Sequence, residues 1–116
     1  MFIAYIVVTL VTLVANAFEG VATIIKADFV KQNIAEVRVP VSWLPMLGAA
    51  KAAGALGLLA GLLGLRPLGI AAAAGLTVFF VCAVIVHLWT RVVHNIAFPV
   101  LFLAFAIASL GLAIAV

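Results

Sequence analysis

Four long apolar runs, nearly free of charge, dominate this chain of 116 residues and leave it few ways to fold. They cover residues 2–25, 45–65, 68–90 and 96–116. A helix needs about 20 residues to cross the hydrocarbon core of a bilayer. Backbone groups cannot remain unpaired in lipid, and the runs lack the alternation of a membrane β-barrel. The sequence therefore predicts an all-α fold, an integral membrane four-helix bundle that forms a single transmembrane domain over residues 1–116.

Composition narrows the classes of function. Hydrophobic residues make up 70% of the chain and charged residues 8%, so no room is left for a separate soluble catalytic domain. The net charge of +3 comes without a dense basic cluster, which argues against a nucleic-acid partner. Cys82 is the single cysteine, so an internal disulfide and a cysteine metal site are excluded within one chain. We expect Cys82 to act as a small apolar residue inside the third span.

The link over residues 26–44 is long and mixed in polarity, unlike the tight Arg66-Pro67 turn and the short polar stretch 91–95. Its apolar residues recur at spacings of 4, 3 and 4, which is the helical period: Val30, Ile34, Val37 and Val41. This pattern predicts a short amphipathic interfacial helix between the first and second spans, lying on the membrane surface and ended by Pro40.

The distribution of basic residues predicts the orientation. One side of the membrane receives Lys26, Lys31, Arg38 and Arg91, and the other receives Arg66 alone. The positive-inside rule then places both chain termini outside. Trp43 and Trp89 fall near the same membrane face, where tryptophan commonly anchors a helix.

The second run is rich in glycine at helical spacing. Four glycines repeat at intervals of 3, 4 and 3 and so share one helix face: Gly54, Gly57, Gly61 and Gly64. Small residues let neighbouring membrane helices approach closely. We interpret this face as a packing surface, either within the bundle or in a homodimer.

The first run carries a polar stripe on one face, formed by Thr9, Thr12, Asn16, Glu19 and Thr23. This face should point into the bundle. Glu19 and Lys51 both lie roughly 10 Å below the same membrane surface, given a rise of about 1.5 Å per residue. If the first two spans are antiparallel neighbours, the two residues can pair, which lowers the cost of burying either charge.

His87, Arg91 and His94 share one face of the third span if that helix continues past Arg91. The bundle then collects its polar residues at one end, where they form either a structural polar network or a polar-headed pocket for a lipophilic molecule. Two histidines on one helix do not suit the two sides of a haem, and their spacing does not suit zinc. No metal site is predicted. The candidate catalytic residues are Glu19, Lys51 and His87, and the candidate ligand-binding residues are Thr12, Asn16, Trp43, Arg91 and His94.

Several segments together resemble the DoxX-like family of small bacterial membrane proteins. They are Val41-Ser42-Trp43-Leu44-Pro45, the glycine- and alanine-rich run from Leu47 to Leu62 around Lys51, Arg66-Pro67-Leu68, and the end of the third span near His87. The resemblance covers nearly the whole chain. It implies a four-helix fold in a bacterial plasma membrane, with Lys51, His87 and Glu19 at the family's polar positions. The family takes its name from a subunit of a membrane thiosulfate:quinone oxidoreductase, and some relatives are linked to thiol redox defence.

Two functions follow as hypotheses. The first is an accessory or ligand-binding module that holds a quinone-like molecule, or contacts a membrane oxidoreductase partner, in a redox system. The alternative is a small membrane enzyme, of the isomerase or cyclase type, with Glu19 as general acid or base on a lipophilic substrate. Thiol–disulfide chemistry is not supported, because the chain has no cysteine pair.

Overall fold

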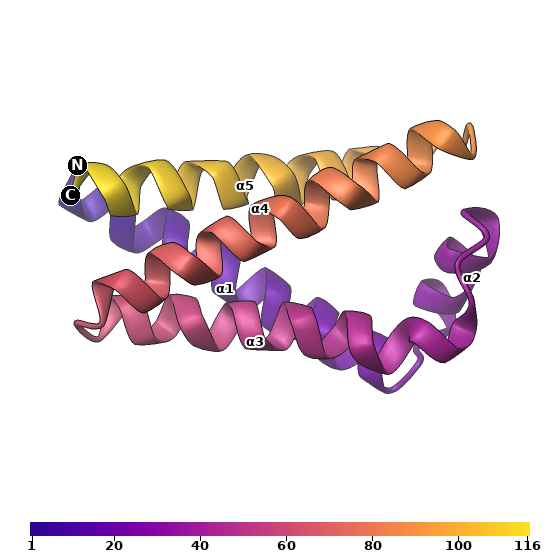
Figure 1. The fold of residues 1–116 in the computed structure, drawn as a ribbon, viewed down its shortest axis with the longest axis horizontal. Helices are drawn as coiled ribbons and strands as arrows, with labels where there is room; N and C mark the ends of the chain where they lie inside the picture. The colour runs from indigo at the N-terminus through magenta and orange to yellow at the C-terminus, as the bar shows by residue number, and fades with distance from the viewer.

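A computed structural model describes residues 1–116, except for the side chain of Asn33. It confirms the all-α prediction, because four helices are each long and apolar enough to cross a membrane. Each of these helices runs antiparallel to the one before it in the sequence (Figure 1). The four are α1 (Phe2–Ile24), α3 (Leu44–Leu62), α4 (Arg66–Trp89) and α5 (Ala97–Ala115).

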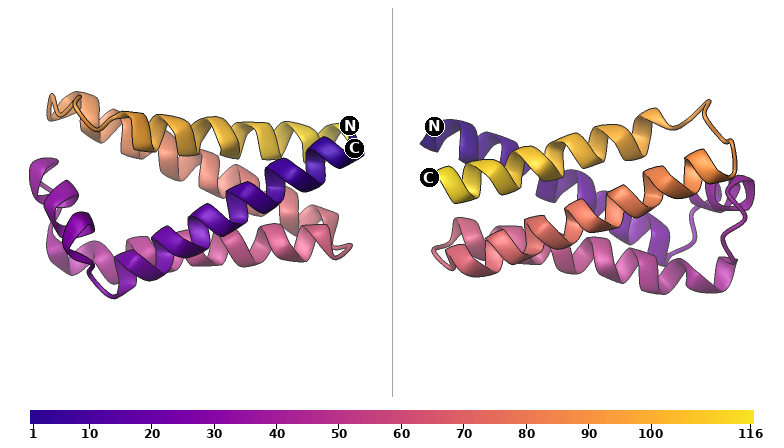
Figure 2. Two further views of the ribbon diagram at one scale, coloured as in Figure 1. Left: turned by 180° about the vertical axis from the view of Figure 1, so that it is seen from behind. Right: turned by 45° about the horizontal axis from the view of Figure 1, so that its top comes forward.

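The four long helices form a closed ring. α1 packs against α3 and α5, α3 packs against α4, and α4 packs against α5. Both ends of the chain lie at one end of the bundle, and the short helix α2 (Asp28–Glu36) lies at the other (Figures 1 and 2). We call the half of the bundle that contains the chain termini the terminal half. The half next to α2 is called the cavity half, because it contains the cavity described below.

Glycines close the terminal half. A Cβ atom on Gly61 would lie 2.7 Å from the Cα of Gly69, so α3 and α4 meet there backbone to backbone. One turn away, a Cβ on Gly57 would lie 2.5 Å from the Cβ of Ala72. The glycine face of the second span is thus a packing surface inside the bundle, as the sequence predicts.

Gly64 is a correction to that prediction. It lies beyond the end of α3 with φ of +116°, and a Cβ atom added there would meet nothing within 4 Å. Its role is to turn the chain into α4, whose first turn contains Pro67.

A second glycine contact holds α1 against α3 in the cavity half. A Cβ atom on Gly48 would lie 2.7 Å from the backbone oxygen of Gly20. The two helices consequently run close together at the level of Glu19 and Lys51, which occupy neighbouring positions on α1 and α3.

The link between the first two spans folds as α2 and a short 3₁₀ turn, Val41–Trp43. Val30 and Val37 are buried, and Val30 packs with Leu44 of α3. The prediction that Pro40 ends this helix is wrong: α2 ends at Glu36, and Arg38 adopts a φ of +60°. Val41 belongs to the 3₁₀ turn, not to the apolar face of α2. A location of α2 on the membrane surface remains a prediction.

The third long helix, α4, does not continue past Arg91, as a shared face of His87, Arg91 and His94 would require. α4 stops at Trp89 and Arg91 has a φ of +60°, which closes the helix. The amide of Val92 donates to the carbonyl oxygen of His87 at 2.9 Å, and the amide of Arg91 donates to that of Leu88 at 3.2 Å. These two bonds form a Schellman motif. The proposed shared face of His87, Arg91 and His94 is therefore wrong, because no helix connects them.

Candidate functional site

A cavity of about 370 Å³ lies in the cavity half, surrounded by all five helices. Its wall is mostly apolar and includes Val30 and Ile34 of α2, Phe79 of α4 and Phe102 of α5. Four polar side chains also line it: Glu19, Lys51, His87 and Asn95. The cavity thus combines an apolar body with a few polar groups, which is the usual composition of a small-molecule site.

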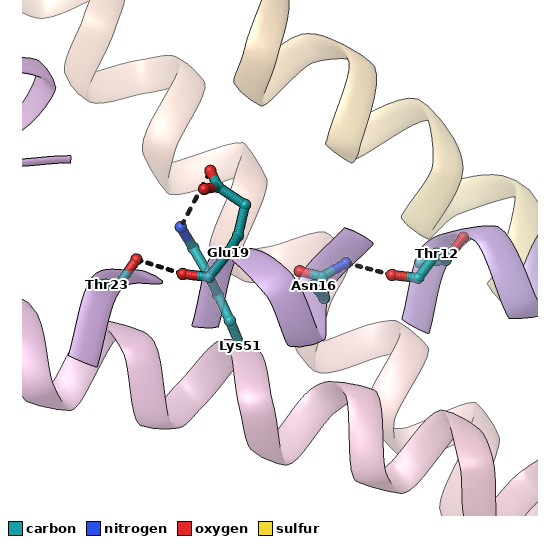
Figure 3. A network of polar contacts seen from close by, with 5 residues as sticks. All are labelled: Thr12, Asn16, Glu19, Thr23 and Lys51. Atoms are coloured by element: carbon teal, nitrogen blue, oxygen red, sulfur yellow. Dashed lines mark hydrogen bonds and ion pairs between the residues drawn. The ribbon is translucent and has the colours of Figure 1, made fainter. Parts of the chain in front are cut away.

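Glu19 and Lys51 form the charged pair of this cavity. Nζ of Lys51 lies 4.0 Å from Oε1 of Glu19 (Figure 3), so the predicted pairing is confirmed. Both side chains are largely buried, with 14% of Lys51 and 22% of Glu19 exposed. The Lys51 ammonium also lies 5.6 Å from the centre of the Phe79 ring, within the range of a cation–π contact.

The second carboxylate oxygen of Glu19 is different from the first. Oε2 is buried and has no hydrogen-bond donor among the described residues. A buried acceptor without a donor is costly, and such groups commonly mark a place where a ligand or water completes the bonding. Glu19, a residue of the cavity wall, therefore carries a buried acceptor oxygen that the described residues leave unsatisfied.

Two predicted ligand-binding residues of α1 lie outside the cavity. Asn16 is 1% exposed, and its side-chain nitrogen donates to the backbone oxygen of Thr12 at 2.9 Å (Figure 3). The Thr12 hydroxyl lies 2.9 Å from the hydroxyl of Ser109 on α5. These residues fasten α1 within the bundle, and the polar stripe does face inward as the sequence predicts.

His87 lines the cavity from α4. Its Nδ1 lies 2.8 Å from the backbone oxygen of Ala83, one turn earlier. A carbonyl oxygen can only accept, so Nδ1 carries the hydrogen and donates it. In the neutral ring, Nε2 then carries a lone pair and acts as an acceptor.

Arg91 and His94 do not line the cavity. Arg91 is exposed in the connection after α4. Nε2 of His94 lies 2.9 Å from Oε2 of Glu36, so this histidine joins the α4–α5 connection to the end of α2. Trp43, by contrast, lines the cavity and is 50% exposed.

Sequence reasoning missed Cys82 and Asn95, and also the aromatic side chains of α4 and α5 that line the cavity, such as Phe79 and Phe102. Cys82 is both exposed and part of the wall, so it lies at the cavity mouth. A signal for it exists in the sequence. Phe79, Ala83 and Val86 share the His87 face of α4 at helical spacing, and Cys82 borders that face.

The described part of the chain contains no group of three His, Cys, Asp or Glu side chains able to hold a metal ion. The donors and acceptors of the cavity instead suit hydrogen bonding to an organic molecule. Its aromatic side chains suit a planar group: the rings of Phe80 and Phe102 lie 5.2 Å apart, and Phe79 packs edge-on against Phe80.

The fold and composition define an integral membrane protein built as a four-helix ring with a cavity at one end. Residues 7–109 match the DoxX-like family, and this match spans most of the chain. The protein therefore belongs to the DoxX-like family. The matched range includes all four polar residues of the cavity wall. Neither a curated protein nor a solved structure matches the chain.

Proposed function

We propose that this protein is a ligand-binding module that holds a lipid-soluble, quinone-like molecule in its cavity, as an accessory component of a membrane redox system. The observation that carries the proposal is the cavity itself, with its apolar wall and the Glu19–Lys51 pair inside it. By the positive-inside rule, the cavity half faces the cytoplasm and the termini lie outside.

The size of the cavity supports this proposal. A dry cavity of about 150 Å³ can hold benzene, and drug-sized ligands occupy sites of about 300–1,000 Å³. A volume of about 370 Å³ accepts one substituted ring and the first part of an attached chain. The rest of an alkyl tail would extend into the surrounding lipid.

The residues at the mouth support a route from the membrane. Trp43 and Cys82 line the cavity and are also exposed, one just before α3 and the other on α4. α3 and α4 diverge in this half, after their close contact in the terminal half (Figure 1). We therefore place the entry for a lipophilic molecule at the exposed lining residues Trp43 and Cys82.

The two tryptophans allow a direct test in lipid nanodiscs. Trp43 lines the cavity, whereas Trp89 is 83% exposed and lies outside it. A decyl-substituted benzoquinone, which quenches tryptophan fluorescence, is titrated into the Trp89→Phe variant, in which Trp43 is the reporter. The matched control is the Trp43→Phe variant, in which Trp89 is the reporter.

We expect saturable quenching of Trp43 and only a linear, partition-type quenching of Trp89. Ala83→Phe, which fills the cavity, should remove the saturable part, while Ala104→Phe on the exposed side of α5 should leave it intact. Linear quenching at both tryptophans would show that the cavity holds no quinone.

The unsatisfied Oε2 atom of Glu19 favours a second candidate function, a small isomerase- or cyclase-type enzyme. A carboxylate that faces a bound substrate can act as general acid or base. Glu19→Gln would then abolish turnover of a lipophilic substrate while the protein stays folded. Parallel losses of activity and of stability would instead assign Glu19 to the structural network.

A further inference from the structure

The polar groups of the cavity differ in how many of their hydrogen-bond donors and acceptors already face a partner within the protein. Lys51 is the strong donor, with up to three N–H groups, and it already faces Oε1 of Glu19 and the ring of Phe79. Asn95 offers both a donor and an acceptor, so it favours neither kind of ligand.

Two acceptors, in contrast, await a donor. Oε2 of Glu19 is buried with no partner among the described side chains and backbone groups. In the neutral form of the His87 ring, Nε2 carries a lone pair, because Nδ1 donates its hydrogen to the backbone oxygen of Ala83. Glu19 lies on α1 and His87 on α4, so acceptors line the cavity from two different helices.

A ligand that brings donors would complete both groups. We infer that the cavity selects an aromatic hydroxyl compound, a phenol or the hydroquinone form of a quinone, over the same ring without a hydroxyl hydrogen. This inference rests on the proposed function and adds the chemical class of the ligand. A quinone carbonyl can only accept, so it can use Lys51 but leaves Oε2 of Glu19 unsatisfied.

The wall around these acceptors suits an aromatic ring. Phe79, Phe80, Phe102 and Trp43 all line the cavity, and offset or edge-on ring contacts contribute beyond the area that they bury. An aliphatic alcohol would supply a donor but not these contacts. The hydroxyl and the ring together therefore define the selected class.

Competition against the benzoquinone probe tests this selectivity. The two competitors are 4-octylphenol and its methyl ether, 4-octylanisole, which keep the same ring and tail and differ in the hydroxyl hydrogen. In nanodiscs of the Trp89→Phe variant, we expect the phenol to displace the probe at a membrane mole fraction at least about tenfold lower than the ether. That ratio is the size expected for one hydrogen bond to a charged acceptor.

Two variants locate the preference. The double variant Glu19→Leu/Lys51→Met removes the carboxylate without leaving a single buried charge, and His87→Phe removes the second acceptor. We expect the preference for phenol to fall to about threefold or less in the double variant and to shrink further when His87→Phe is added. Thr77→Val, whose hydroxyl bonds only within α4, serves as the control and should keep the full preference.

The outcomes separate this inference from the proposed function. Saturable quenching with equal displacement by phenol and ether, or with no displacement by either, would overturn the inference and leave quinone binding in place. A preference that survives unchanged in the double variant would overturn the assignment to Glu19. Absence of any saturable quenching would overturn the proposed function itself.

Discussion

The two halves of the bundle use the same pair of helices in opposite ways. In the terminal half, α3 and α4 meet at Gly61 and Gly69 with no side chain between their backbones. In the cavity half, the same helices diverge, and Lys51 and Phe79 line the space between them. A tight seam at one end allows an open site at the other. Stability and ligand binding should therefore respond to different substitutions.

The largest effect is expected at the seam. Gly69→Val should lower the free energy of unfolding by about 3 kcal/mol, because its Cβ would lie 2.8 Å from the Cα of Gly61, a backbone atom that cannot move aside. Unfolding in mixed micelles measures the change. The same substitution at Gly75, also on α4 but with nothing within 4 Å, is the control. Equal losses at both positions would show that the seam does not hold the bundle together.

A smaller effect is expected at the charged pair. Lys51→Met leaves Glu19 without its cation and should cost about 2 kcal/mol of stability, the order expected for a largely buried charge left without its partner. Glu19→Leu/Lys51→Met should regain most of that loss, because neither charge then remains. Binding of the phenol should nevertheless stay weak in the double variant. A double variant whose loss of stability equals the sum of the single losses would contradict the pairing.

The smallest effect is expected at the contact between α1 and α5. Thr12→Val removes the hydroxyl pair with Ser109, and such a bond contributes about 0.6 kcal/mol on average between membrane helices. Thr77→Val, which breaks a bond within one helix, should cost less. Neither substitution should alter ligand binding, since neither residue lines the cavity. A change in affinity from Thr12→Val would indicate that the two halves are coupled.

The spans, the inward polar stripe and the Glu19–Lys51 pair were predictable because they depend on periodicity and depth alone. A helix rises by a constant amount per residue, so two residues at equal depth on antiparallel neighbours come level. The glycine face was predictable for the same reason, up to Gly64. The prediction for Gly64 was wrong because the helical spacing of the glycines continues in the sequence beyond the residue at which α3 ends.

Helix ends were the main source of error. α1, α2 and α4 each end in a Schellman motif whose left-handed residue is Lys26, Arg38 or Arg91, where glycine or asparagine is the usual signal. The positive charge of these residues interacts favourably with the negative end of the helix dipole. A basic residue in the sequence does not, however, predict that a helix ends there. The misplacement of His94 followed directly from the missed stop at Arg91.

Cys82 and Asn95 were missed for a different reason. A cavity arises where helices diverge, and divergence depends on crossing angles that a linear pattern does not contain. Cys82 has an apolar context in sequence, and only the departure of α4 from α3 places it at a mouth. Asn95 lines the cavity because the short connection between α4 and α5 passes beside it.

The unequal lengths of the helices connect this site to the membrane itself. α4 has 24 residues and α5 has 19, so at the usual helical rise they measure about 36 Å and about 28 Å. A bilayer core of roughly 30 Å accommodates the longer helix by tilting it. α4 also leans away from α3 beyond the glycine seam (Figure 1). If the cavity holds the proposed ligand, a thicker bilayer should favour an upright α4, narrow the site and reduce ligand capture.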